Sequence, residues 1–533
     1  MTRSIAAVLF ASLVACGGAQ STKGGPVNAS LGDLEHPKYS GQKKLVVLLV
    51  IDQLPEWAFA QKAPHMTKGF DRVLREGHWL LGQHPTPATL TAPGHALLGS
   101  GEPPYHSGIL ANEWWDRESA KVITSVEDGD KKDAHQLRVP GMGDAVAAAG
   151  TGARAVSVSL KDRAAILPLG HQGTAIWYDK TQVAFISSEP AAWLSAYNTT
   201  HPVRAHLKDV WTPGDPARLA QLSGTIDAQP GEVGEKRFGP TFPHDIGANK
   251  EPADAIFATP LGNQLVFDTA LAAIDGEKLG TDTATDFLAM SLSAHDYVGH
   301  GWGHESWESW DMWFKLDEQL AAFMASLDAK VGAGQWAMII TSDHGAAHMP
   351  DRAHGGRLVQ PSLAAAANNA AATELGGGQW VTVAKYPYIW MTPAFFTKPV
   401  ADRSKAMEKV LRALRSFPGV AMADRTATFA GDCDKRKGEA AAICMMIDAE
   451  RAGEVFWLPK ADWIFEDPDE PLATAHGSWN AYDREVPVLM LPFGRSAHDR
   501  ATKPESEVQM VRISTVIAEW LGVTPPLAMP RKH

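Results

Sequence analysis

The residues of this chain with the clearest chemical potential are a threonine-bearing turn and three short groups of carboxylates and imidazoles. The turn reads Thr89-Leu90-Thr91-Ala92-Pro93-Gly94-His95. A threonine hydroxyl is a poor nucleophile alone, but a divalent metal that binds its oxygen lowers its pKa and activates it. Zn²⁺ accepts carboxylate and imidazole ligands. The candidate ligands lie in Asp296-Tyr297-Val298-Gly299-His300, Asp343-His344-Gly345 and His476-Gly477.

None of these signals is specific when taken alone. Asp52 follows an apolar run, where an acidic residue could equally bind a nucleotide ribose or cap a helix. Asp343 and His344 face one ion only if the backbone bends after them, and we expect Gly345 to permit the bend. Asp296 and His300 lie in a histidine-rich stretch that could be a solvated loop, and His476 alone would be a loop histidine. These residues therefore count only as a set.

The elements that must position this set are four aliphatic runs, each followed by a polar residue. Strands buried on both faces read as such uninterrupted runs, and helical patterns separate them. The expected fold class is α/β, with a mostly parallel central sheet covered by helices on both faces. In an open sheet of this kind the ligand site lies at the carboxyl ends of the strands. The runs are residues 45–51, 153–160, 287–292 and 336–341.

Two further patterns predict covering helices. Large apolar residues recur at helical spacing over residues 310–327, and again from Ile513 to Trp520 before Gly522, which is a common helix stop. Residues 170–270 and 380–475 are richer in Pro, Gly and Trp and break the alternation. We interpret them as insertions that wall the active site, within one catalytic domain that spans residues 43–533.

The amino terminus predicts export. Arg3 precedes an apolar stretch from Ile5 to Val14, which is too short to span a bilayer as a mature helix. Residues 13–17 resemble a bacterial lipobox, so we expect residues 1–15 to be removed and a lipid on Cys16 to attach the protein to a membrane. The expected location is the periplasm or cell envelope of a bacterium. The alternative is a plain secretory signal with a chance cysteine. Residues 16–42 lack apolar periodicity and are predicted to be a flexible tether.

Composition limits the remaining possibilities. A net charge of -12 without a basic cluster argues against a nucleic-acid partner. The hydrophobic content of 45% suits a globular body, which we expect to be a monomer. Cys433 and Cys444 lie in a polar segment, and in an exported protein a local disulfide between them is favoured over two free thiols.

Together these residues resemble the alkaline phosphatase superfamily, and within it the nucleotide pyrophosphatase/phosphodiesterase branch that includes the phosphate-irrepressible alkaline phosphatases. The resemblance runs from Leu45 to about Leu521. It implies two zinc ions as cofactors. It assigns one ion to Asp52, Asp343 and His344 with the nucleophile oxygen, and the other to Asp296, His300 and His476.

The resemblance also assigns the nucleophile. The family places it in a Thr-x-x-Gly-His pattern, which favours Thr91 over Thr86 and Thr89. The segment from His106 to Asn112 is similar to a family His-Gly-Ile segment with a phosphate-binding asparagine, here Asn112, although Ser107 departs from the pattern. Its amide would donate to a nonbridging phosphoryl oxygen.

Lys161 and Arg163 bear on the choice of ester. They alternate at the end of a predicted strand, which would put both side chains on one edge. They could be merely solvated charges, but a Lys-x-Arg pair in this region resembles the pair that the phosphate-irrepressible enzymes place on the transferred phosphoryl group. A monoester dianion gains more from such cations than a diester does. We therefore predict an alkaline phosphatase that hydrolyses small phosphate monoesters through a phosphothreonine.

Two alternatives stay open. A phosphodiesterase or nucleotide pyrophosphatase would share the six ligands and the threonine, and a noncatalytic zinc-binding lipoprotein would need the ligands but not Thr91. A sulfatase is excluded, because the chain around Thr91 lacks the Cys/Ser-x-Pro-x-Arg setting from which formylglycine is made. A lipid-headgroup transferase would normally carry several membrane helices, which the sequence does not offer.

Overall fold

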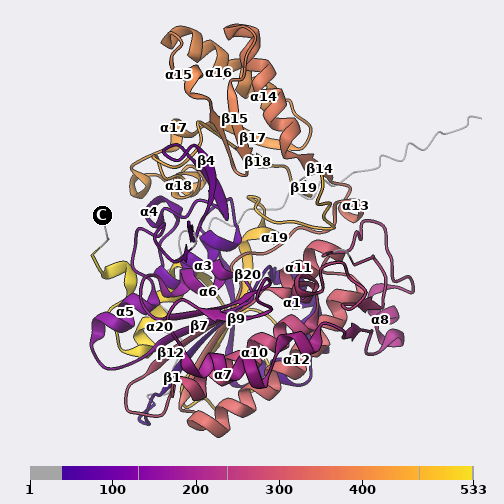
Figure 1. The fold of residues 1–533 in the computed structure, drawn as a ribbon, viewed down its shortest axis with the longest axis vertical. Coiled ribbons are helices and arrows are strands. Elements are labelled where there is room, and N and C mark those ends of the chain that lie inside the picture. Colours follow the sequence, from indigo (N-terminus) through magenta and orange to yellow (C-terminus); the bar gives the residue numbers. More distant parts are fainter. Residues whose placement is uncertain (1–38, 130, 237, 467, 531–533) are drawn as a thin grey trace, which may run out of the picture.

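A computed structural model describes residues 39–530 apart from residues 130, 237 and 467 (Figure 1). A sheet of nine strands, in the order β21-β2-β20-β13-β1-β12-β7-β8-β9, forms its centre. The expected α/β class is confirmed: β1 pairs in parallel with β12 and β13, β12 with β7, and β7 with β8. The export signal, Cys16 and all but the end of the tether lie outside the described residues.

The four aliphatic runs become the four central strands. They are β1 (Leu45–Ile51), β7 (Ala155–Ser159), β12 (Asp286–Leu292) and β13 (Trp336–Thr341), and every residue in them is buried. Strand side chains alternate between faces, so β1 contributes to two cores. Val46, Leu48 and Val50 pack into one core, while Leu45, Leu49 and other alternate residues pack into the second.

Helices cover both faces of the sheet (Figure 1). On the face of Val46 lie α3 (Thr91–Ser100), α6 (Asp162–Leu169) and α20 (Ile513–Leu521). On the other face lie α10 (Pro260–Gly276) and α12 (Trp307–Leu327). The two helices expected from apolar spacing are thus α12 and α20, and Gly522 ends α20 in the left-handed conformation.

One side of the sheet is antiparallel. The strand β20 (Glu485–Leu491) pairs antiparallel with β13 and with β2 (His78–Gln83), and β2 pairs in parallel with the edge strand β21 (Glu507–Gln509). The sequence pattern did not predict these three strands, because they lie outside the four aliphatic runs.

The segment expected as an insertion at 170–270 begins inside the main sheet. Its first two strands, β8 (Thr174–Asp179) and β9 (Ala184–Ser187), form the edge next to β7. Only the chain after Ser187 leaves the sheet, and it returns as α10 to cover a face.

The segment expected at 380–475 builds a second, smaller unit at the top of Figure 1. Its sheet has the order β15-β16-β18-β17, and α14 and α16 pack against each other beside it. A disulfide joins Cys433 to Cys444, with a Cα–Cα distance of 5.4 Å. The bounds are β15 (Val381–Lys385), β16 (Tyr388–Met391), β17 (Val420–Arg425), β18 (Val455–Pro459), α14 (Gln360–Leu375) and α16 (Val400–Arg415).

Within the described part of the chain, every helix is too short or too polar to cross a lipid bilayer.

Candidate active site

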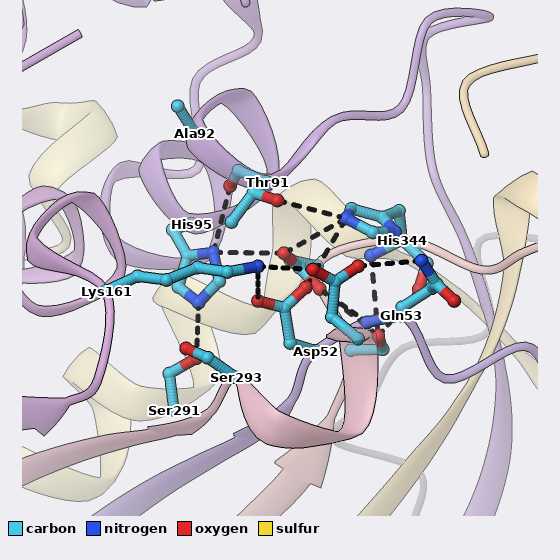
Figure 2. Close-up of polar contacts among 12 residues, drawn as sticks. Asp52, Gln53, Thr91, Ala92, His95, Lys161, Ser291, Ser293 and His344 are labelled. Atoms are coloured by element: carbon cyan, nitrogen blue, oxygen red, sulfur yellow. Dashed lines mark hydrogen bonds and ion pairs between the residues drawn. The ribbon is translucent and has the colours of Figure 1, made fainter. Parts of the chain in front are cut away.

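The carboxyl ends of β1, β12 and β13 bring distant acidic residues into one place. The register pairs Val50 with both Ser291 of β12 and Thr341 of β13, so these strands end side by side. Asp52 follows β1, Asp343 follows β13, and Asp296 lies in α11 (Ala294–Trp302) after β12. The polar contacts of this cluster are shown in Figure 2.

One group of possible metal ligands contains Asp52, Asp343 and His344, all fully buried, with ligand atoms within 4.8 Å of one another. His344 Nε2 lies 3.5 Å from Asp52 Oδ1 and 3.4 Å from Asp343 Oδ2. The other ring nitrogen, Nδ1, lies 3.0 Å from the carbonyl oxygen of Gly345. Because a carbonyl oxygen can only accept, Nδ1 is the donor. In the neutral ring Nε2 then has a lone pair, which faces the carboxylates.

A second group contains Asp296, His344 and His476, again with ligand atoms within 4.8 Å of one another. His300 Nε2 joins it 3.1 Å from Asp296 Oδ1, because the two residues are one helical turn apart in α11. The Nδ1 atoms of both His300 and His476 donate to backbone carbonyls, of Thr474 and Thr89, at 2.9 Å. Both imidazoles therefore present Nε2 to the site.

The carboxylates of the cluster are electrostatically unequal. Burial raises the pKa of Asp52 well above its usual range, and the nearby charge of Asp343 adds to the rise. Burial acts on Asp343 and Asp296 in the same direction, but it is outweighed. His344 and His95 hold the pKa of Asp343 far below its ordinary value, and Lys161 does the same for Asp296. Asp52 is thus the carboxylate that most needs an added cation.

The surroundings of two imidazoles, His344 and His476, suit metal binding, whereas for His300 the effect of burial is outweighed by Asp296, which raises the pKa of the ring. Burial lowers the pKa of His344 and, much further, that of His476, where the nearby rings of His344 and His300 add to the effect. The rings of His344 and His476 stack with their centroids 3.6 Å apart. A metal ligand must be a neutral imidazole, so these environments favour the ligating form.

Thr91 is the first residue of α3, at the helix end where backbone N–H groups favour a negative charge. Its Oγ1 lies 3.4 Å from Nε2 of His344, the histidine that belongs to both ligand groups. Gly94 makes this approach possible, because an added Cβ would lie 2.3 Å from the carbonyl oxygen of Asp343. His95 then ties the helix to the site through Asp343 Oδ2 at 3.1 Å and Ser291 Oγ at 2.8 Å. The Gly-His pair in the turn thus positions Thr91.

Asn112 lies beside the same helix end. Its Oδ1 accepts a hydrogen bond of 2.9 Å from the backbone N–H of Ala92, next to the threonine. With the oxygen engaged, the amide NH₂ is the group left to donate to a ligand.

Lys161 and Arg163 lie on a different element from the one that the sequence predicts. The strand β7 ends at Ser159, so Lys161 is the N-cap of α6 and Arg163 lies in its first turn, instead of on a strand edge. Lys161 Nζ reaches into the acidic cluster, 2.7 Å from Asp52 Oδ2 and 2.5 Å from Asp296 Oδ2. Burial alone would lower the pKa of Lys161, but these two carboxylates raise it. Among the described residues, nothing accepts a hydrogen bond from the buried Nε of Arg163.

The backbone bends at Asp343, and Gly345 allows close packing beside the bend. Gly345 is not among the described residues with a positive φ, but an added Cβ would lie 2.1 Å from the carbonyl oxygen of Tyr482. Gln53, in contrast, has a left-handed backbone with a φ of 62°.

Sequence reasoning missed Gln53 as a site residue. Its Nε2 lies 2.7 Å from Asp296 Oδ1 and 3.0 Å from His300 Nε2, while its Oε1 lies 3.0 Å from His304 Nε2. Gly299 leaves room for this amide, because a Cβ there would lie 2.0 Å from Gln53 Oε1. Its position next to Asp52 was the available signal.

These residues fit two divalent ions. Three buried carboxylates converge with three imidazoles, which is a donor set that zinc accepts. In the described part of the chain, Asp52 Oδ1 is buried and has no hydrogen-bond partner. A buried carboxylate oxygen without a partner is costly, and a bound cation would compensate it.

Comparisons with known proteins identify the family of the chain. Residues 46–481 match the family described as "Type I phosphodiesterase / nucleotide pyrophosphatase". The chain is 31% identical to alkaline phosphatase PhoV of Synechococcus elongatus, over 92% of each chain, and 28% identical to alkaline phosphatase PafA of Elizabethkingia meningoseptica, over 85% of this chain and 87% of that one. Crystal structures of PafA superpose with a TM-score of 0.80 at 27% identity. The wild-type structure covers 92% of this chain and 98% of that one. Another is of a variant with a threonine, an asparagine, a lysine and an arginine replaced.

The fold and the site together define a phosphatase with two groups of possible metal ligands. The chain belongs to the type I phosphodiesterase/nucleotide pyrophosphatase family and, within it, is close to the PafA-type alkaline phosphatases.

Proposed function

We propose that this protein is a zinc-dependent phosphatase that hydrolyses small phosphate monoesters through a phosphothreonine. The observation that carries the proposal is the position of Thr91 Oγ1 at the amino end of α3, 3.4 Å from a histidine that belongs to both ligand groups. A noncatalytic zinc-binding protein would need the ligands alone, without a hydroxyl placed among them.

Asp52, Asp343 and His344 would hold one ion, and Asp296, His300 and His476 the other. When bound, two zinc ions would supply positive charge that lowers the pKa of a hydroxyl and offsets the charge that develops on the phosphoryl oxygens. The imidazoles keep Nε2 free for this role, because backbone carbonyls of Gly345, Thr474 and Thr89 hold Nδ1.

The residues of the chain then have distinct roles. Thr91 Oγ1 attacks phosphorus in line with the leaving group, and the P–O bond to the ester oxygen breaks as the new bond forms. The hydroxyl gives its proton to solvent, and the departing ester oxygen takes one from solvent to leave as an alcohol. The N–H groups at the start of α3 favour the anionic species formed there. Asn112 donates its amide NH₂ to a nonbridging oxygen. Attack of water on the phosphothreonine releases inorganic phosphate and restores the hydroxyl.

Lys161 and Arg163 support the choice of a monoester. A monoester dianion has one more unesterified oxygen than a diester, and two cations at the start of α6 would compensate its charge. For this the ammonium of Lys161 must turn from Asp52 and Asp296 toward the phosphoryl group. Zinc ions on those carboxylates would favour that turn, because they take over the charge that Lys161 neutralises. The PafA variant is replaced at the same four residue types that we assign here.

The test compares a matched monoester and diester, such as p-nitrophenyl phosphate and bis-p-nitrophenyl phosphate, with zinc supplied. We expect the wild type to prefer the monoester. Arg163→Ala and the pair Lys161→Ala/Arg163→Ala should lower monoester turnover, the pair on the order of a hundredfold or more, with a much smaller effect on the diester. Zinc content is measured for each variant, because Lys161 also contacts two ligand carboxylates. A wild type that prefers diesters, or equal losses on both esters, would support a phosphodiesterase instead.

A further inference from the structure

A cavity of about 420 Å³ in the smaller unit contains none of the residues assigned to phosphoryl transfer. Its walls come from α16, from the end of β17 and the turn after it, and from the segment 449–454. Phe395 and Met407 supply large apolar surfaces, and several alanines line the rest. A volume of this size suits a small organic molecule.

The cavity is strongly basic in a chain whose net charge is -12. Three arginines and one glutamate line it. Arg117 is already paired, since it donates to the carbonyls of Glu450 and Ala452 at 2.8 and 2.7 Å and to Glu454 Oε1 at 2.7 Å. Arg117 and the glutamate therefore neutralise each other.

The other two arginines have no such compensation. Within the described residues, the guanidinium of Arg425 has a single acceptor, the carbonyl oxygen of Ser404 at 3.2 Å, and the buried Nε of Arg403 has none. No carboxylate of the described chain forms an ion pair with either one. An arginine does not lose its proton, so its charge persists in the cavity wall and favours an anion from outside the chain.

A buried hydroxyl points to the same conclusion. Thr426 also lines the cavity, is 6% exposed, and its Oγ1 has no hydrogen-bond partner among the described residues. Buried hydroxyl groups in folded proteins are normally hydrogen-bonded. Water would satisfy this hydroxyl but would not neutralise two guanidinium groups.

We propose that this cavity binds an organic anion. Its acidic group, a carboxylate, phosphate or sulfonate, lies on Arg403 and Arg425 within reach of Thr426, and its apolar body packs against Phe395 and Met407. Inorganic phosphate alone would leave those apolar walls uncovered, so the ligand needs both parts.

The probe is 1-anilinonaphthalene-8-sulfonate, which carries one acidic group on an apolar body and fluoresces when bound in an apolar site. Titration of the full-length wild type should show one saturable site. Arg403→Gln/Arg425→Gln should weaken the affinity at least tenfold. Arg412→Gln, an exposed arginine of the same helix α16 that does not line the cavity, should stay within twofold of the wild type.

A second variant protects the test against misfolding. Ala430→Phe fills the cavity and keeps both arginines, so it should also weaken binding at least tenfold. Circular dichroism melting establishes that each variant is folded. Wild-type affinity in the folded double variant, or no saturable site in the wild type, overturns the proposal. Neither readout depends on phosphatase turnover, so the result stands apart from the proposed function.

Discussion

At the scale of single residues, Thr91 competes with Thr89 for the role of nucleophile. Both are buried, but they differ in their surroundings. Thr91 Oγ1 lies 3.4 Å from His344 Nε2, whereas Thr89 contributes its backbone carbonyl to His476 and its Oγ1 has no partner among the described residues. Thr89 thus orients a ligand, and Thr91 faces the ligand groups.

We predict that Thr91→Ala retains zinc and loses turnover by on the order of a thousandfold or more, because the attacking oxygen is gone. Thr89→Ala should keep most of the activity, since its backbone carbonyl is unchanged. Acid quenching during turnover of the wild type should leave phosphate on Thr91, located by mass spectrometry. Phosphate found on Thr86 or Thr89 would refute the assignment.

Glu308, which lies away from the candidate metal site, makes the stability of the folded protein depend on pH. Burial raises its pKa to about 10, and Asp227 adds to the rise. Its Oε1 lies 3.0 Å from His244 Nε2, and its Oε2 has no partner in the described chain. The folded protein therefore keeps a proton on Glu308 that the unfolded chain releases near pH 4.5. The stability that this proton provides is complete below that pH and is lost as the pH rises toward about 10.

Glu308→Gln should remove this dependence, because glutamine keeps the shape without an ionisable proton. We expect the variant to be more stable than the wild type at pH 8–9, by a free energy of unfolding on the order of 5 kcal/mol, and to match it near pH 4.5. Thermal melting across this pH range measures the difference. A constant offset between the two proteins at all pH values would contradict the assignment.

At the scale of elements, helix α3 has two glycines that make close contacts of different consequence. A Cβ on Gly94 would lie 2.3 Å from the carbonyl oxygen of Asp343, and a Cβ on Gly99 would lie 2.3 Å from that of Pro168 in α6. The first contact sets the distance between Thr91 and the metal ligands. The second only packs one helix on another.

Gly94→Ala should therefore move α3 away from the end of β13 and lower turnover by roughly a hundredfold, since small displacements of a reacting group are costly. Gly99→Ala is the matched control. It should lower the melting temperature to a similar extent and leave turnover within about tenfold of the wild type. Equal losses of turnover would show that α3 acts on activity only through stability.

The elements also show which parts of the fold and of the site could be predicted from the sequence. The apolar run from Leu45 to Ile51 has the same bounds as β1, because in a strand that is buried on both faces every side chain lies in a core. Lys161 and Arg163 were placed on the wrong element, since an apolar run does not reveal that β7 stops at Ser159 and a helix starts at Asp162. Gln53 was missed because its partners Asp296 and His304 lie more than 240 residues away in the chain.

At the scale of the whole molecule, the sheet gathers a buried negative charge that the chain compensates only in part. Asp52, Asp296 and Asp343 are each at most 3% exposed, and Lys161 is the lysine that contacts two of them. The smaller unit contributes to the same centre, because Tyr386 donates a hydrogen bond to the carbonyl oxygen of Gly477, next to His476. Folding around this centre and filling it with cations are therefore coupled.

Metal removal should consequently affect both stability and activity. We predict that a chelator abolishes monoester turnover and lowers the melting temperature, and that zinc restores both. An ion that binds only the folded state stabilises it by about 2.7 kcal/mol at a hundredfold excess over its Kd, so the shift should grow with zinc concentration. Asp52→Asn is the matched control. It lowers the negative charge of the group that holds one ion, so its melting temperature should depend less on zinc than that of the wild type. Full activity in the stripped protein would show that turnover needs no bound metal. An equal zinc dependence in Asp52→Asn would mean that the ion binds elsewhere than at the carboxyl ends of β1, β12 and β13.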